Sequence, residues 1–181
     1  CGRYRGDLGA AAAREALAGP PCLCSLDQVQ RYRSRISGPL LDRIDLHVLV
    51  DAVTYRDYAA VGEGETSTAI RERVVAARAR GHERLGAARC NASMSDGELR
   101  HHVMLDEAQL WLVEQAIERY GLSTRAIGRT LKVARTLADL AGHARVGTAE
   151  LSEAIGFRLL DRDPLLAMLP TGELGDDAYA A

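Results

Sequence analysis

Apolar side chains recur every three or four residues along most of the second half of the chain. This period places them on one face of an α-helix, where they can pack against other helices. The pattern predicts helices over residues 68–80, 107–120, 124–141 and 149–161, with one or two further turns over 96–102. We therefore expect residues 63–166 to form an all-α domain. The acidic, glycine-bearing residues 167–181 are expected to be a disordered tail.

The first part of the chain has a different pattern. Ser25 and Gln28 are spaced as a capping box, which predicts a helix running to about Ile36. A Ser-Gly-Pro corner at 37–39 ends it, because proline clashes with the preceding helical turn. Apolar and polar residues then alternate, which predicts a strand over residues 44–50. This strand needs neighbouring strands for which the printed sequence has no candidates.

Composition narrows the choice of function only slightly. The 181 residues carry a net charge of −2, so overall charge does not indicate a nucleic-acid-binding protein. Lys132 is the only lysine, and arginine supplies the remaining positive charge. Without an apolar run of about 20 residues or a visible signal peptide, we expect a cytoplasmic protein with no membrane span.

Arg43 and a cluster of three cations are candidates for a binding or catalytic role. Arg43 lies between Asp42 and Asp45, where the predicted strand begins. The residues alone favour a surface arginine paired with a neighbouring carboxylate over one that reaches a phosphate on another subunit. In the predicted helix 124–141, Arg125 and two further cations, at positions 129 and 132, fall within about 60° of one another. That face is either a binding site or an ordinary solvated surface.

Two sequence blocks carry a family resemblance. The run SGPLLDRIDL at 37–46, preceded by QVQRYRSRI, resembles the second half of the AAA+ module in magnesium chelatase-like ATPases, in their competence-protein branch. The block LSTRAIGRTLKVARTLADLAG at 122–142 is similar to the lid signature of the same branch. The resemblance implies a mainly α fold. Residues 1–62 would be the end of the AAA+ α/β core, with a helix and the last core strand, and residues 63–166 the helical lid.

The resemblance also implies roles for two arginines. Arg43 matches the arginine finger, which acts on ATP bound to a neighbouring subunit, and Arg125 matches the second sensor arginine, which contacts the nucleotide phosphates within its own subunit or across the interface. The resemblance further implies homo-hexameric rings that use ATP and Mg²⁺ to move along branched DNA in recombination and natural transformation. The chain contains no GxxxxGK[ST] phosphate loop. We therefore expect these residues alone not to hydrolyse ATP.

Three cysteines form a candidate metal site. Cys1, Cys22 and Cys24 are one ligand short of a tetrahedral zinc site. The resemblance implies a structural zinc whose fourth thiolate lies upstream of Cys1. Thiols without a metal, or a disulfide, are the alternatives.

Two other functions remain open. A magnesium chelatase motor subunit would share the fold and the finger but act on a porphyrin-handling partner. A non-enzymatic DNA-binding module is the second alternative, because helices 107–120 and 124–141 resemble a helix-turn-helix in outline.

Overall fold

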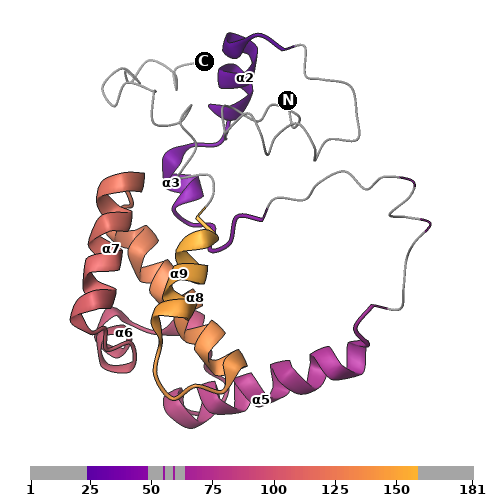
Figure 1. Ribbon diagram of the computed structural model, residues 1–181, viewed down its shortest axis with the longest axis vertical. Coiled ribbons are helices and arrows are strands. Elements are labelled where there is room, and N and C mark those ends of the chain that lie inside the picture. Colours follow the sequence, from indigo (N-terminus) through magenta and orange to yellow (C-terminus); the bar gives the residue numbers. More distant parts are fainter. Residues whose placement is uncertain (1–23, 49–54, 56–58, 60–63, 159–181) are drawn as a thin grey trace.

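A computed structural model describes residues 24–48, 55, 59 and 64–158 of the chain. All regular secondary structure in this part is helical, which confirms the mainly α fold (Figure 1). No helix among these residues is long and apolar enough to cross a membrane. The helices are α2 (Leu26–Arg33), α3 (Gly38–Leu41), α5 (Ser67–Leu85), the 3₁₀ helix η1 (Asn91–Ser93), α6 (Asp96–His102), α7 (Glu107–Tyr120), α8 (Thr124–Ala141) and α9 (Thr148–Gly156).

Polar caps set the boundaries of the central helices. Asp106 caps α7 in a reciprocal capping box with Gln109. Gly121 ends α7 in the left-handed conformation, with φ of 62°, which a side chain would strain. Ser123 then accepts a hydrogen bond from the Ala126 N–H and begins α8. Helices 107–120 and 124–141 are therefore confirmed to the residue.

The helix predicted over 68–80 is longer than expected. It continues as α5 to Leu85, and Gly81, the residue after the predicted end, is buried within it. Figure 1 shows the first half of α5 extending beyond the other helices. Ile70 and Val74, in this first half, are accordingly exposed, whereas Ala77 is buried.

The beginning of the described chain departs further from prediction. The first helix ends at Arg33, and the Ser-Gly-Pro corner itself begins the short helix α3, with Pro39 in its first turn. Residues 44–48 of the expected strand 44–50 form no strand. A strand requires a neighbour to bond its backbone, and the described residues offer no other strand. The His47 N–H instead donates to the Phe157 carbonyl, 2.8 Å away, at the end of α9.

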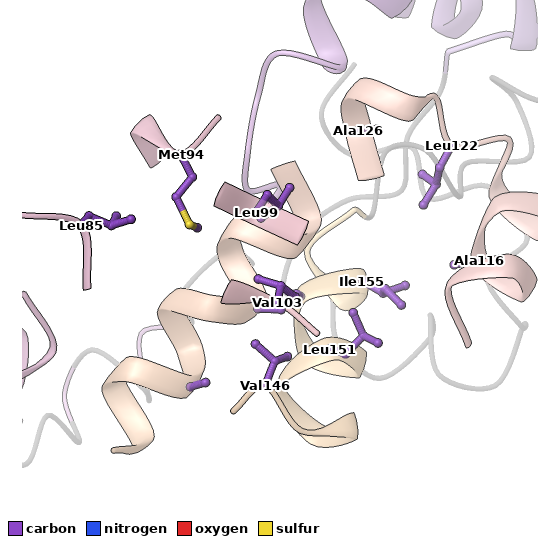
Figure 2. Close-up of a cluster of buried hydrophobic side chains, with 13 residues drawn as sticks. Leu85, Met94, Leu99, Val103, Ala116, Leu122, Ala126, Val146, Leu151 and Ile155 are labelled. Carbon is purple, nitrogen blue, oxygen red and sulfur yellow. The ribbon is translucent and has the colours of Figure 1, made fainter. Parts of the chain in front are cut away.

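The hydrophobic core lies among η1, α6, α7, α8 and α9 (Figure 2). Its buried members come from α5, α6, α7, α8 and α9 and from the loops between these helices. They are Leu85, Met94, Leu99, Val103, Ala116, Leu122, Ala126, Ala134, Ala138, Val146, Leu151, Ala154 and Ile155. Three buried alanines let α8 approach its neighbours closely, and α8 packs against α5, α6, α9 and η1. It is the central helix of this bundle.

A buried ionic network joins α8 to α5 and η1. The Asp139 carboxylate is almost fully buried and accepts hydrogen bonds from Arg84, Arg135 and Asn91. Burial by itself would raise the pKa of the Asp139 carboxyl. The hydrogen bonds from Arg84 and Asn91 and the charges of Arg135 and Arg84 outweigh it, so this pKa is below its ordinary value.

A second carboxylate caps α9. Glu150 accepts a hydrogen bond from the Gly147 N–H at 2.8 Å, and its Oε1 lies 2.8 Å from His143 Nδ1. The bond from its own backbone N–H, together with these two partners, lowers the pKa of the Glu150 carboxyl.

We expect acid to unfold this helical domain. The pKa values of Asp139 and Glu150 are lowered by folding, so the unfolded chain binds more protons at acidic pH. The free energy of unfolding should be nearly constant above about pH 5 and fall as the pH drops below about 4. Urea unfolding of the chain at a series of pH values measures this, and Glu150→Gln should reduce the slope. A stability independent of pH over this range would contradict the assignment.

Candidate functional site

The residues around Arg43 are bound to the α-helical bundle. Asp42 accepts a hydrogen bond from Ser123 Oγ at 2.7 Å, at the N-terminus of α8. Asp45 forms an ion pair of 2.5 Å with Arg129, in the second turn of α8. The loop of residues 42–47 is therefore attached to a helix about 80 residues away in the sequence.

Arg158, which follows α9 in the chain, holds the same loop in place. Its side chain is 0% exposed, and Nη1 donates to the Ile44 carbonyl at 2.6 Å. Its Nη2 lies 4.0 Å from the Asp42 carboxylate. Burial of a guanidinium is costly unless hydrogen bonds replace water, which the backbone carbonyl does here. Sequence reasoning missed Arg158; the only signal is a single arginine within the apolar run IGFRLL.

The side chain of Arg43 itself is exposed. Its backbone N–H bonds to the Leu40 carbonyl, but its guanidinium forms no ion pair with any residue that the structure describes. The carboxylates beside it, Asp42 and Asp45, are bound to Ser123 and Arg129 instead. The alternative in which Arg43 is merely paired with its neighbouring acids therefore has no support.

Arg125 is the second residue of α8 and is also exposed. Its helix begins at Ser123, whose hydroxyl both caps α8 and bonds to Asp42. Arg125 is thus held in the helical turn to which the Arg43 loop is attached. The exposed N–H groups of a helix N-terminus favour negative charge nearby.

A groove of about 1260 Å³ runs along one side of α8. Arg125, Arg129 and Lys132 contribute to its wall, as the predicted cationic face requires. Two of these cations have partners: Arg129 pairs with Asp45, and Lys132 Nζ donates to the Ala92 carbonyl at 3.2 Å. The rest of the wall is largely apolar, with side chains such as Leu46 and Leu140.

The opposite face of α8 is not wholly apolar. Ala134 and Ala138 are buried there, but Ala141 is exposed. Arg135 is 1% exposed and donates to Asp139 and to the carbonyl of His143. Its role is to hold the bundle together.

The cysteine prediction falls mainly outside the described residues. Cys1 and Cys22 are not among them, and Cys24 is half-buried. Within the described ranges, no three His, Cys, Asp or Glu side chains gather as a metal site. The three-cysteine zinc site therefore stays a prediction without structural support.

Two family models match the chain. The model for the C-terminal part of magnesium chelatase subunit ChlI matches residues 64–158, more than half of the chain, and the model for the ChlI subunit matches residues 10–58. The chain belongs to the magnesium chelatase ChlI family. Membership confirms the predicted resemblance and places the chain among AAA+ proteins, which in general depend on ATP and Mg²⁺ and typically form oligomeric rings.

Similar proteins come from several bacteria. Competence protein ComM of Haemophilus influenzae is 38% identical over 139 residues, which are 76% of this chain and 27% of ComM. YifB of Escherichia coli is 36% identical over 140 residues, 77% of this chain and 27% of YifB. Rv2897c of Mycobacterium tuberculosis is 37% identical over 139 residues, 76% of this chain and 27% of that protein. The chain thus spans about a quarter of the length of the curated relatives it matches.

Arg125 has the chemistry that a phosphate-binding residue requires. Arg125 presents an unburied guanidinium at the start of α8, beside a groove with an apolar wall. Guanidinium groups suit phosphate oxygens because they donate two parallel hydrogen bonds. The same part of the chain brings no three carboxylates or imidazoles together to hold Mg²⁺.

Proposed function

We propose that this chain supplies Arg43 as the arginine finger of an ATP-hydrolysing AAA+ ring. Arg43 would contact the phosphates of ATP bound to the neighbouring subunit, where a guanidinium stabilises the negative charge of the transition state. The observation that carries this proposal is the guanidinium of Arg43, which is exposed and forms no ion pair with any residue that the structure describes, between two carboxylates that bind other residues. A finger must keep its charge available, and neither Asp42 nor Asp45 neutralises it here.

Arg125 is proposed as the second sensor arginine. It is exposed, lies in the first turn of α8 and contributes to the groove wall. Its two cationic neighbours on the helix face have partners within the chain, so Arg125 is the member of that face that supports a nucleotide contact. Residues 1–62 and 63–166 are proposed as the end of the AAA+ core and the lid, respectively.

We further propose that the full-length protein acts on DNA as a homo-hexamer in the cytoplasm. The support is the similarity to a protein named for competence, ComM. A magnesium chelatase motor subunit would use the same two arginines on another partner. The helix-turn-helix alternative is weaker, because α8 is the central helix of the bundle and packs against four other elements. Of the three cations on the side of α8 that borders the groove, Arg129 and Lys132 already have partners within the chain.

Mixing two inactive variants tests the proposal. One variant is Arg43→Ala; the other keeps Arg43 but is disabled in the phosphate loop of the full-length protein. Each should be nearly inactive alone, whereas a random equal mixture should regain roughly a quarter of the wild-type ATPase rate. Recovery arises where an intact finger faces an intact loop on the next subunit. No recovery in mixed rings, verified by co-purification of differently tagged subunits, would show that Arg43 does not act across an interface.

A further inference from the structure

Every described residue next to Arg43 is tied to the lid. Asp42 bonds to Ser123 at the start of α8, and Asp45 pairs with Arg129 one turn later. The Ile44 carbonyl accepts a hydrogen bond from Arg158, beyond α9. These contacts span 81, 84 and 114 residues of sequence.

These contacts leave the loop of residues 42–47 little freedom to rotate. They come from two separate elements, α8 and the end of α9, and they hold the loop on both sides of Arg43. The short helix α3 holds the preceding backbone, since the Arg43 and Ile44 N–H groups bond to the Leu40 and Leu41 carbonyls at 3.0 Å. The guanidinium of Arg43 nevertheless remains exposed.

The Asp45–Arg129 pair is the contact of this loop that can be altered with little effect on folding. Its side chains are 48% and 33% exposed, unlike the fully buried Arg158. An exposed ion pair contributes little to the stability of a fold. It can nevertheless orient a loop, and a catalytic group displaced by about 1 Å can lose a hundredfold in rate.

We propose that the lid positions Arg43 through the Asp45–Arg129 ion pair, so that the finger and the start of α8 move as one piece. This inference rests on the proposed role of Arg43 as a finger. Asp45 and Arg129 are positioning residues that do not touch the nucleotide in this role. The lid, rather than the core segment alone, then determines where the finger lies.

The test measures the ATPase kinetics of the full-length protein. Asp45→Asn and Arg129→Gln should each lower kcat about tenfold or more and leave the KM for ATP unchanged. The reversed pair, Asp45→Arg with Arg129→Asp, should recover most of the lost kcat. In an Arg43→Ala background, Asp45→Asn should have no further effect, because residues that act as a unit are not additive. Glu65→Gln is the matched control: it breaks the exposed Arg73–Glu65 pair, also 2.5 Å long, and should leave kcat unchanged.

The outcomes separate this inference from the proposed function. If Arg43→Ala lowers kcat but Asp45→Asn and Arg129→Gln leave kcat unchanged, Arg43 is still supported as the arginine finger, and its positioning by the ion pair is wrong. An equal effect of Asp45→Asn with and without Arg43 would also overturn the positioning role. An unchanged kcat in Arg43→Ala would overturn both. If Arg129→Gln alters the circular dichroism of the helices, its kcat reports on folding as well as on positioning. The kcat of Asp45→Asn alone then tests the positioning role.

Discussion

Replacing Arg43 with alanine in the full-length protein is expected to lower the rate of ATP hydrolysis about a thousandfold, with nucleotide affinity nearly unchanged. Negative charge is spread over the phosphate oxygens in the transition state, and a guanidinium delivered from the next subunit stabilises it more than it stabilises bound ATP. An interaction made mainly in the transition state affects kcat and not binding. The exposed side chain of Arg43 also means that its removal leaves no cavity in the described fold.

The measurement compares single-turnover hydrolysis with equilibrium binding of a labelled nucleotide. Arg35→Ala is the control, since Arg35 is likewise exposed and lies shortly before Arg43 in the chain. It should leave both quantities near wild type. A loss of affinity as large as the loss of rate would mean that Arg43 binds ground-state nucleotide, and the finger assignment would be wrong.

Local signals predicted the helices well. Asp106, Gly121 and Ser123 mark the ends of α7 and α8 by capping chemistry that acts within a few residues. These signals are written in neighbouring residues, so periodicity and caps together define each helix. Gly81 misled the prediction because nothing nearby shows that it is buried inside α5.

Long-range contacts could not be predicted in this way. Period-two alternation indicated a strand over 44–50, but in the described residues 44–48 the contacts of the loop with α8 and α9 replace strand pairing. The partners of Asp45 and Ile44 lie 84 and 114 residues away, and no local pattern links them. Buried charges posed the same difficulty: no local pattern shows that Arg135 is buried, and its carboxylate partner Asp139 makes that burial possible.

The candidate site shows both what the sequence could predict and what it could not. Motif resemblance singled out Arg43 and Arg125, and the structure finds each exposed, one in the loop and the other in the helical turn that holds the loop. The connection between them through Ser123 and Asp42 is tertiary. It could be found only once the fold brought residue 42 next to the start of α8.

Asp139→Asn is expected to destabilise the helical domain by about 3–5 kcal/mol. Asp139 is the shared acceptor for Arg84 and Arg135, whose side chains are 16% and 1% exposed. Asparagine keeps the shape but removes the charge, which leaves two guanidinium groups with little access to water and no anion between them. A buried charge without its partner is far more costly than an exposed one.

The chain contains a geometric control that isolates burial. Arg73 and Glu65 form a bidentate ion pair, as Arg84 and Asp139 do. The N–O distances between Arg73 and Glu65 are 2.5 and 3.0 Å, but their side chains are 57% and 43% exposed. Glu65→Gln should therefore cost less than about 1 kcal/mol. Urea unfolding of the two variants, followed by circular dichroism at neutral pH, compares them directly. Equal losses would show that burial of the Asp139 network does not determine the stability of the bundle, and would leave pair geometry as the cause.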